Sequence, residues 1–385
     1  RVGSSKGGGG DPEGSRCRLG KRAGMLPQAR FLPLRFLPPT PQDAVAASKV
    51  MAHECLAIRR RIDKEYSTKA ALAEGDPSVY TGAAGVAYMY WRLATMDSHY
   101  IPGQREELLE KATTYSKAAL RLVRPERRGQ RRTSTFLTGA AGVYCVAAAI
   151  AFTKNETTSA ASYCQQVLAL GSTCVTPDVP SELLYGRAGF LSCLLFLAAN
   201  AGLQLKECGD VIAGTIQLIL ADGANLADAD FPLMWAWHDT LYLGAAHGLC
   251  GILLILLHFH DVVAALGGGA LLRSAIDALL TTRFPSGNLP SSIGSKKDDV
   301  LVHWCHGAPG LIPLLCTAHH VYGDPSYLEA AEKAARVVAA RGLLRKGFGI
   351  CHGVAGNALA LLALERHRVR IQQIRSAAQA VPGEE

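Results

Sequence analysis

The chain contains 385 residues, of which 49% are hydrophobic, and this composition supports a large buried core in one or two domains. Its formal net charge is +8, yet residues 1–40 hold eight Lys or Arg and two acidic residues, so the remaining residues carry a net charge of +2. A nearly neutral body offers no basic face to a phosphate backbone, and we therefore expect no nucleic-acid partner.

Residues 1–40 differ in composition from the rest of the chain. They contain the glycine run Gly7–Gly10 and several prolines, and such low-complexity segments do not bury a core. We predict a disordered tail over residues 1–40 and a folded domain over residues 41–385. A solvated tail is the expectation, and peripheral contact with acidic lipid is an alternative that nothing else in the sequence supports. The chain begins with Arg1 and not with methionine, so we expect its natural start to lie upstream.

The eleven cysteines form no Cys-x-x-Cys pair, and most of them lie in apolar helical stretches. A free thiol in such a stretch is a small buried hydrophobic group. No signal peptide is visible, so the sequence favours a reducing, cytoplasmic setting.

One phrase occurs six times along the chain: a glycine, two other residues, a second glycine and then an apolar helical run. The six copies are Gly82–Gly85, Gly139–Gly142, Gly186–Gly189, Gly248–Gly251, Gly307–Gly310 and Gly353–Gly356. Their first glycines are 46 to 62 residues apart, which is the spacing of a repeated helical unit.

Two kinds of helix alternate between these glycines. The segments 105–123 and 325–340 are amphipathic, and in the second we expect Glu329, Lys333 and Arg336 to face solvent. The segments 189–205 and 249–259 are apolar on nearly all sides, which predicts helices buried in the interior. Repeated pairs of outer and inner helices favour an all-α fold, an α/α toroid in the form of a double-layered helical barrel, with almost no sheet. An open solenoid is the alternative.

The tripeptides Cys305-His306-Gly307 and Cys351-His352-Gly353 stand at the fifth and sixth glycine turns. The repeat places the residues before each turn at the same end of the barrel, so these side chains are expected to meet. Thiolates and imidazoles are the ligands that zinc prefers, and a catalytic zinc keeps three of them and one open position. We predict one zinc ion bound by Cys305, Cys351 and His352; only one of the two histidines is needed, so His306 is the less certain ligand.

Other polar residues before the glycine turns belong to the same end. His247 is a candidate general acid or base, and Glu182 is a second catalytic candidate that would alternatively cap a helix. We predict that Tyr185 and Arg187, which flank Gly186, contact the substrate.

The two Cys-His-Gly blocks and the Gly-x-x-Gly series, together with Leu184–Phe190 and Ala246-His247-Gly248, resemble the lanthionine synthetase C-like (LanC-like) proteins over about residues 45–365. The resemblance implies zinc on Cys305, Cys351 and His352, with His247 as acid or base. It also implies glutathione as co-substrate or ligand, with Lys346 beside it, and a dehydrated protein or peptide substrate whose dehydroalanine or dehydrobutyrine accepts the thiol. Glu182 stands where bacterial members have an aspartate, and Leu301 replaces a bacterial arginine, so these two roles transfer weakly.

The family closes its barrel with seven inner helices, and a seventh glycine pair is expected about one repeat length after Gly353. The chain ends at Glu385, so we expect six repeats, a C-terminally truncated toroid and a cost in stability. Two functions stay open under this resemblance. One is a zinc-dependent transferase that adds glutathione to dehydroamino acids, and the other is a non-catalytic zinc- and glutathione-binding scaffold or signalling adaptor. A toroidal glycosidase is a weaker third, because it needs paired acids and this end offers Glu182 alone.

Overall fold

The computed structural model describes residues 30, 41–96, 104–124 and 134–379. The chain divides into two units, residues 1–30 and 31–385, and the described helices belong to the second. Arg30 apart, the predicted disordered tail lies outside the described residues.

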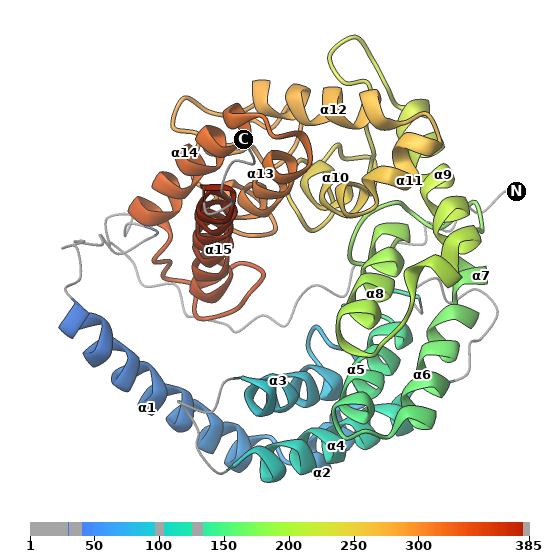
Figure 1. The fold of residues 1–385 in the computed structure, drawn as a ribbon, viewed down its shortest axis with the longest axis vertical. Coiled ribbons are helices and arrows are strands. Elements are labelled where there is room, and N and C mark those ends of the chain that lie inside the picture. Colours follow the sequence, from blue (N-terminus) through green and yellow to red (C-terminus); the bar gives the residue numbers. More distant parts are fainter. Residues whose placement is uncertain (1–29, 31–40, 97–103, 125–133, 380–385) are drawn as a thin grey trace, which may run out of the picture. The chain divides into compact units, whose positions relative to one another are not determined.

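The second unit is helical (Figure 1). Its elements are α1 (Pro41–Glu65), α2 (Thr68–Glu74), α3 (Ala83–Thr95), α4 (Arg105–Leu122), α5 (Ala140–Thr153), α6 (Thr157–Ala169), α7 (Gly171–Cys174), α8 (Arg187–Asn200), the 3₁₀ turn η1 (Leu205–Cys208), α9 (Gly209–Asn225), α10 (Leu249–His258), α11 (His260–Ala265), α12 (Gly269–Thr281), α13 (Ala308–Tyr322), α14 (Pro325–Arg341) and α15 (Val354–Gln379). Within the described residues, β structure is limited to two isolated bridges, Trp237–Thr240 and Tyr242–Ser292. The predicted all-α class is therefore confirmed.

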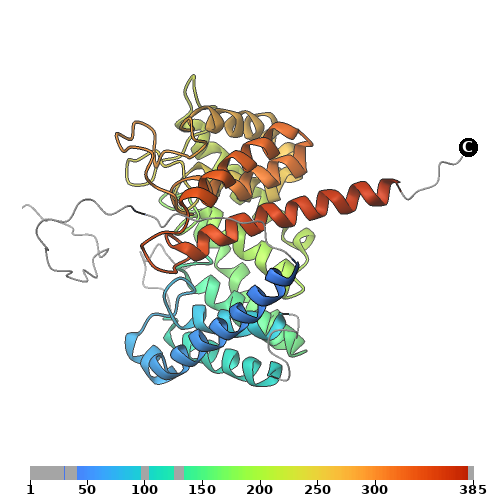
Figure 2. The same cartoon turned by 90° about the vertical axis from the view of Figure 1, so that its left-hand side faces the viewer.

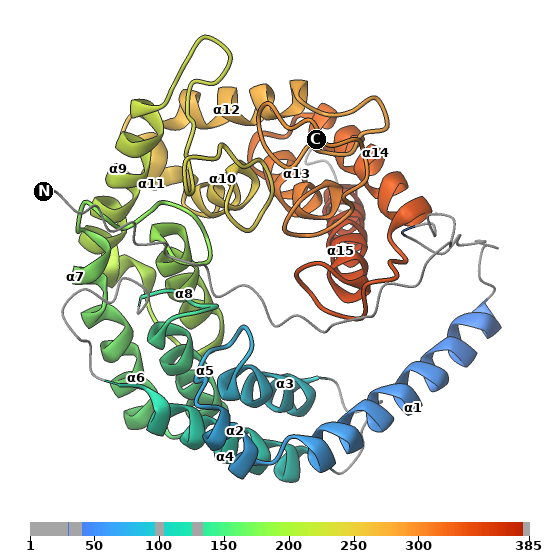
Figure 3. The same ribbon diagram turned by 180° about the vertical axis from the view of Figure 1, so that it is seen from behind.

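Within the part of the chain that the structure describes, six helices form the inner layer: α3, α5, α8, α10, α13 and α15. Each begins one residue after the first glycine of a pair, and each packs against the next in the series, as Figures 1 and 3 show from opposite sides. In α10, eight of the ten residues are buried. α15 differs from this pattern, because Leu359 and Leu362 are exposed.

The outer layer consists of α4, α6, α9, α12 and α14, and α4, α6 and α14 pack on the inner helices that precede them. Each of the five buries one stripe of its surface. In α14, Tyr327, Ala331 and Val338 are buried, whereas Glu329, Lys333 and Arg336 face solvent, as the sequence predicted.

One predicted boundary is wrong. The apolar segment 189–205 does not form one helix, because α8 ends at Asn200 and the chain turns at Gly202, whose φ is +75°. The Asn200 side-chain amide donates to the carbonyl oxygen of Phe196, 2.8 Å away, and helps to end the helix.

The glycine pairs are required because backbone packs on backbone where the inner helices begin. A Cβ at Gly310 would collide with the carbonyl oxygen of Trp304, and one at Gly356 would collide with that of Ile350. Gly307 also has φ +125°, which side-chain-bearing residues rarely adopt. These approaches bring the segments before the inner helices together at one end of the unit.

A side view shows the loops that precede the inner helices at one end and α15 extending beyond the other helices at the opposite end (Figure 2). None of the helices among the described residues is both long and apolar enough to cross a bilayer.

Candidate metal centre

Two sulphur atoms and one imidazole meet where α13 and α15 begin. One ligand atom from each of Cys305, Cys351 and His352 lies within 4.8 Å of the others. The Cys305 backbone N–H donates to the Cys351 carbonyl oxygen at 3.1 Å, which fixes the two segments to each other. These three residues form the metal-binding group. Cys305 is buried, Cys351 is half-buried and His352 is exposed, so the metal-binding group opens to solvent on one side.

Two buried asparagines hold the segment that carries Cys305. The Asn288 side chain accepts from the Ala308 backbone N–H at 2.7 Å and donates to the Leu301 carbonyl oxygen at 2.8 Å. The Asn357 amide, on α15, donates to the carbonyl oxygens of Val302 and Gly342. Our sequence reasoning missed Asn288, which stands in an irregular stretch with no repeat signal.

A hydrogen bond joins the two thiols. This bond to Cys305 lowers the pKa of Cys351 to about 5. The same bond and burial raise the pKa of Cys305. The Cys351 sulphur is therefore the more easily ionised of the two. A zinc ion would suit this donor set, because thiolates and imidazoles are the ligands that zinc prefers and a cation would stabilise both sulphurs in their ionised form.

A carboxylate orients the imidazole of His247. Its Nδ1 lies 2.7 Å from Oε2 of Glu182, which is only 2% exposed. The same carboxylate accepts from the backbone N–H groups of Leu184 and Tyr185. The Glu182 carboxylate thus has its hydrogen-bond partners inside the protein. It orients His247 by binding Nδ1, which leaves Nε2 as the ring nitrogen that Glu182 does not bind.

Aromatic rings extend from His247 to His306, the residue that follows Cys305. Tyr185 lies nearly parallel to the His247 ring, with 6.0 Å between their centroids. The Tyr242 ring centroid lies 5.9 Å from that of His247 and 5.5 Å from that of His306. The Trp237 ring lies nearly parallel to the His247 ring, with their centroids 5.6 Å apart. Sequence reasoning found Tyr185 but missed Tyr242 and Trp237, because neither stands beside a glycine turn.

Two exposed lysines, Lys297 and Lys346, act on the residues of the site. Burial is the main reason why the pKa of His306 falls to about 4, and nearby positive groups, Lys297 and Lys346 among them, add to the effect. The Lys346 charge also acts on Cys305. Both lysines are exposed, so they are available to an anionic ligand.

Arg187 lies elsewhere. Its side chain is 1% exposed and forms an ion pair with Asp222 at 2.6 Å. It also donates to the carbonyl oxygens of Cys174 and Thr176. These contacts give Arg187 a structural role in joining α8 to its outer neighbours, and they give no support to the predicted substrate contact.

Tyr80, before α3, is a further residue that sequence reasoning missed. Burial raises its pKa, and so does a hydrogen bond between its hydroxyl and the Cys351 sulphur. Tyr80 stands two residues before Gly82, just as Cys351 stands two residues before Gly353. This shared register was the available signal.

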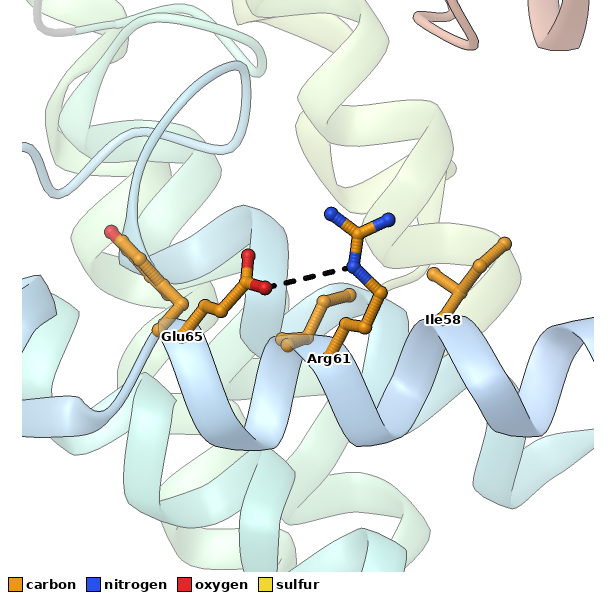
Figure 4. A pocket seen from close by; sticks show the side chains of 5 residues that line it. Ile58, Arg61 and Glu65 are labelled. Carbon is orange, nitrogen blue, oxygen red and sulfur yellow. Dashed lines mark ion pairs between the residues drawn. The ribbon is translucent and has the colours of Figure 1, made fainter.

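A separate pocket lies on α1, lined by Ile58, Arg61, Ile62, Glu65 and Tyr66 (Figure 4). It contains an exposed ion pair between Arg61 and Glu65 at 3.7 Å. None of its lining residues belongs to the metal-binding group, and exposed pairs of this kind contribute little.

The described helices form a two-layered α/α toroid. In fold, the chain is similar to nisin cyclase, with a TM-score of 0.58 over 87% of this chain and 88% of that one, at 16% identity. Residues 73–369 match the family described as lanthionine synthetase C-like protein. The chain is 35% identical over 297 residues to "Glutathione S-transferase LANCL1" of Danio rerio, covering 75% of this chain and 70% of the relative. It is also 35% identical over 318 residues to "LanC-like protein GCL1" of Arabidopsis thaliana, covering 77% and 69%. The chain belongs to the LanC-like family.

Proposed function

We propose that this protein is a zinc-dependent enzyme that adds the thiol of glutathione to dehydroalanine or dehydrobutyrine residues of proteins or peptides. The observation that carries the proposal is the convergence of Cys305, Cys351 and His352 beside the oriented imidazole of His247. The zebrafish relative is named a glutathione S-transferase, and this name supports the choice of thiol.

Activation of the glutathione thiol depends on the metal-binding group. Cys305, Cys351 and His352 would hold the zinc ion, which when bound lowers the pKa of a thiol so that the thiolate is present near neutral pH. The exposed lysines support the binding of glutathione, since its carboxylates are attracted to Lys346.

His247 acts as the general base and then as the general acid of the proposed addition. The thiolate sulphur forms a bond to Cβ of the dehydroamino acid as the C=C π bond breaks, which leaves an enolate with negative charge shared by Cα and the carbonyl oxygen. His247 takes up the proton released by the thiol, and the resulting imidazolium gives this proton from Nε2 to Cα, so the neutral imidazole is regenerated and the addition balances. Glu182 stabilises the imidazolium and keeps the ring in place through Nδ1. Tyr185 lies against the His247 ring and forms part of the wall that the substrate meets.

The test mixes the purified chain, glutathione and a short dehydroalanine peptide, and it measures the adduct by mass spectrometry and the zinc content by elemental analysis. We expect about one zinc per chain and an adduct. Cys305→Ala should lose both, whereas His247→Ala should lose the adduct and keep zinc. Phe152→Ala, an exposed aromatic at the far end of α5, serves as the control that keeps both.

Zinc at full occupancy without any adduct would reject the enzyme and favour the glutathione-binding scaffold. Adduct formation at the wild-type rate after loss of Cys305 would reject the role of the metal-binding group.

A further inference from the structure

A short hairpin holds Trp237 against His247. His247 and Glu182, which are hydrogen-bonded to each other, form the acid–base pair of the proposed function. Trp237 N–H donates to the Thr240 carbonyl oxygen at 2.9 Å, and Thr240 N–H donates back at 3.1 Å. The two residues between them, His238 and Asp239, have φ values of +46° and +59°. A turn with two such residues is normally built from Asn-Gly or Gly-Gly, so this sequence keeps an unfavourable backbone conformation without glycine.

Both flanks of the hairpin are anchored. On one side, the Trp235 indole N–H donates to the Ile219 carbonyl oxygen at 2.9 Å in the core. On the other side, Leu243 N–H donates to Ser291, and Ile293 N–H donates to Leu241, at 3.1 and 2.9 Å. The position of Trp237 is therefore set by the core, and not by chance collapse of a surface loop.

The Trp237 ring joins two rings of the site. It lies at 10° to the plane of His247, with centroids 5.6 Å apart, and at 18° to Tyr185, with centroids 5.5 Å apart. Glu182 already orients His247, so the acid–base pair does not need Trp237 for its own geometry. The indole is partly exposed. The hairpin thus presents a rigid, flat, apolar surface next to the group that handles the proton.

We propose that Trp237 is a substrate-positioning residue whose indole binds the planar conjugated C=C–C=O unit of a dehydroamino acid and directs its Cα toward His247. This proposal rests on the proposed function. A dehydroalanine unit is flat and polarisable, so it packs on an aromatic face in an offset stack; the saturated alanine unit has a tetrahedral Cα and does not. The site would therefore select unsaturated residues before any bond forms.

The test measures peptide binding without glutathione, so that no turnover is needed. The two probes are a peptide with one dehydroalanine and the same peptide with alanine there, titrated calorimetrically into the zinc-loaded protein. Trp237→Ala should raise the Kd of the dehydroalanine peptide about tenfold, which corresponds to about 1.4 kcal/mol. It should leave the Kd of the alanine peptide and the zinc content unchanged. Trp237→Phe should restore most of the preference, and Phe152→Ala should leave both Kd values as in wild type.

With glutathione present, Trp237→Ala should raise KM for the dehydroalanine peptide by a similar factor and change kcat little. Wild type that prefers the unsaturated peptide but forms no adduct would reject the proposed function and support the Trp237 subsite. Three results would overturn the subsite: no preference in wild type, an unchanged preference in Trp237→Ala, or equal weakening of both peptides.

Discussion

Removing the Asn288 side chain should loosen the metal centre without touching any metal ligand. Asn288 is fully buried, accepts from the Ala308 N–H, and donates to the Leu301 carbonyl oxygen and to Asp299. In Asn288→Ala, the Ala308 N–H and the Leu301 oxygen lose their partner, and each buried polar group left unpaired costs about 1–3 kcal/mol.

The two unpaired groups give an expected loss of about 2–6 kcal/mol in the free energy of unfolding, a large share of the roughly 5–15 kcal/mol of a typical domain. The segment 301–308 carries Cys305, so the dissociation constant for zinc should also rise, by about tenfold or more. Urea unfolding in the presence of a chelator measures the first effect, and competition with a chromophoric chelator measures the second.

Asn225→Ala, at the exposed end of α9, is the matched control and should change neither quantity. A midpoint for Asn288→Ala that equals the wild-type midpoint would refute the reasoning. So would a zinc affinity that falls equally in both variants.

Three further predictions concern residues around this framework. Burial opposes ionisation of Asp299, but hydrogen bonds from Ser286, Asn288 and Arg341 and the Arg341 charge together lower its pKa. Its stabilising contribution is present above about pH 4, the pKa of an unfolded aspartate, and is lost as pH falls further; thermal unfolding at pH 7 and pH 3 should show a smaller acid-induced drop for Asp299→Asn than for wild type. Gly310→Ala should destabilise the protein by about 3 kcal/mol or more, because its Cβ meets the Trp304 carbonyl oxygen. Gly209→Ala, at a helical position with open space around it, should be neutral or should stabilise the protein by up to about 1 kcal/mol. Equal unfolding midpoints of the two variants in denaturant would contradict this prediction. Arg187→Met should cost about 2–4 kcal/mol, because two carbonyl oxygens lose their donor and Asp222 keeps only the hydrogen bond from Ser181. KM for glutathione in the folded fraction should stay at its wild-type value, and a selective rise in KM would support the predicted role of Arg187 in substrate binding.

The repeat was readable from the sequence because each copy obeys the same packing constraint. Glycines that must accept a neighbouring backbone recur at fixed places, and apolar helices follow them, so both the layers and the meeting of Cys305 with Cys351 follow from the register. Outer helices were readable for the same reason: one buried stripe leaves a clear period in α14.

The missed residues lie where the chain has no period. Trp237, Tyr242 and Asn288 stand in the irregular segments 226–248 and 282–307, whose paths depend on hydrogen bonds between distant residues. Arg187 stands beside a glycine turn, where a charged residue resembles a site residue, and its substrate contact stays a prediction. Only the structure shows that Asp222, on the outer helix α9, takes its charge.

The register also explains how one barrel end acquires its chemistry. The residues two positions before the first glycines form a single cluster: Leu137, Leu184, Ala246, Cys305 and Cys351 pack together, and Tyr80 bonds to Cys351. One position later stand Thr81, Thr138, Tyr185, His247, His306 and His352. The two threonines are used locally, since Thr81 donates to Asp76 and Thr138 donates to the Leu184 carbonyl oxygen. The other four line the metal-binding group and the acid–base pair. A change from apolar to sulphur at one register position, and from hydroxyl to imidazole at the next, therefore supplies the donor atoms of the candidate metal centre without altering the glycines that hold the rim together.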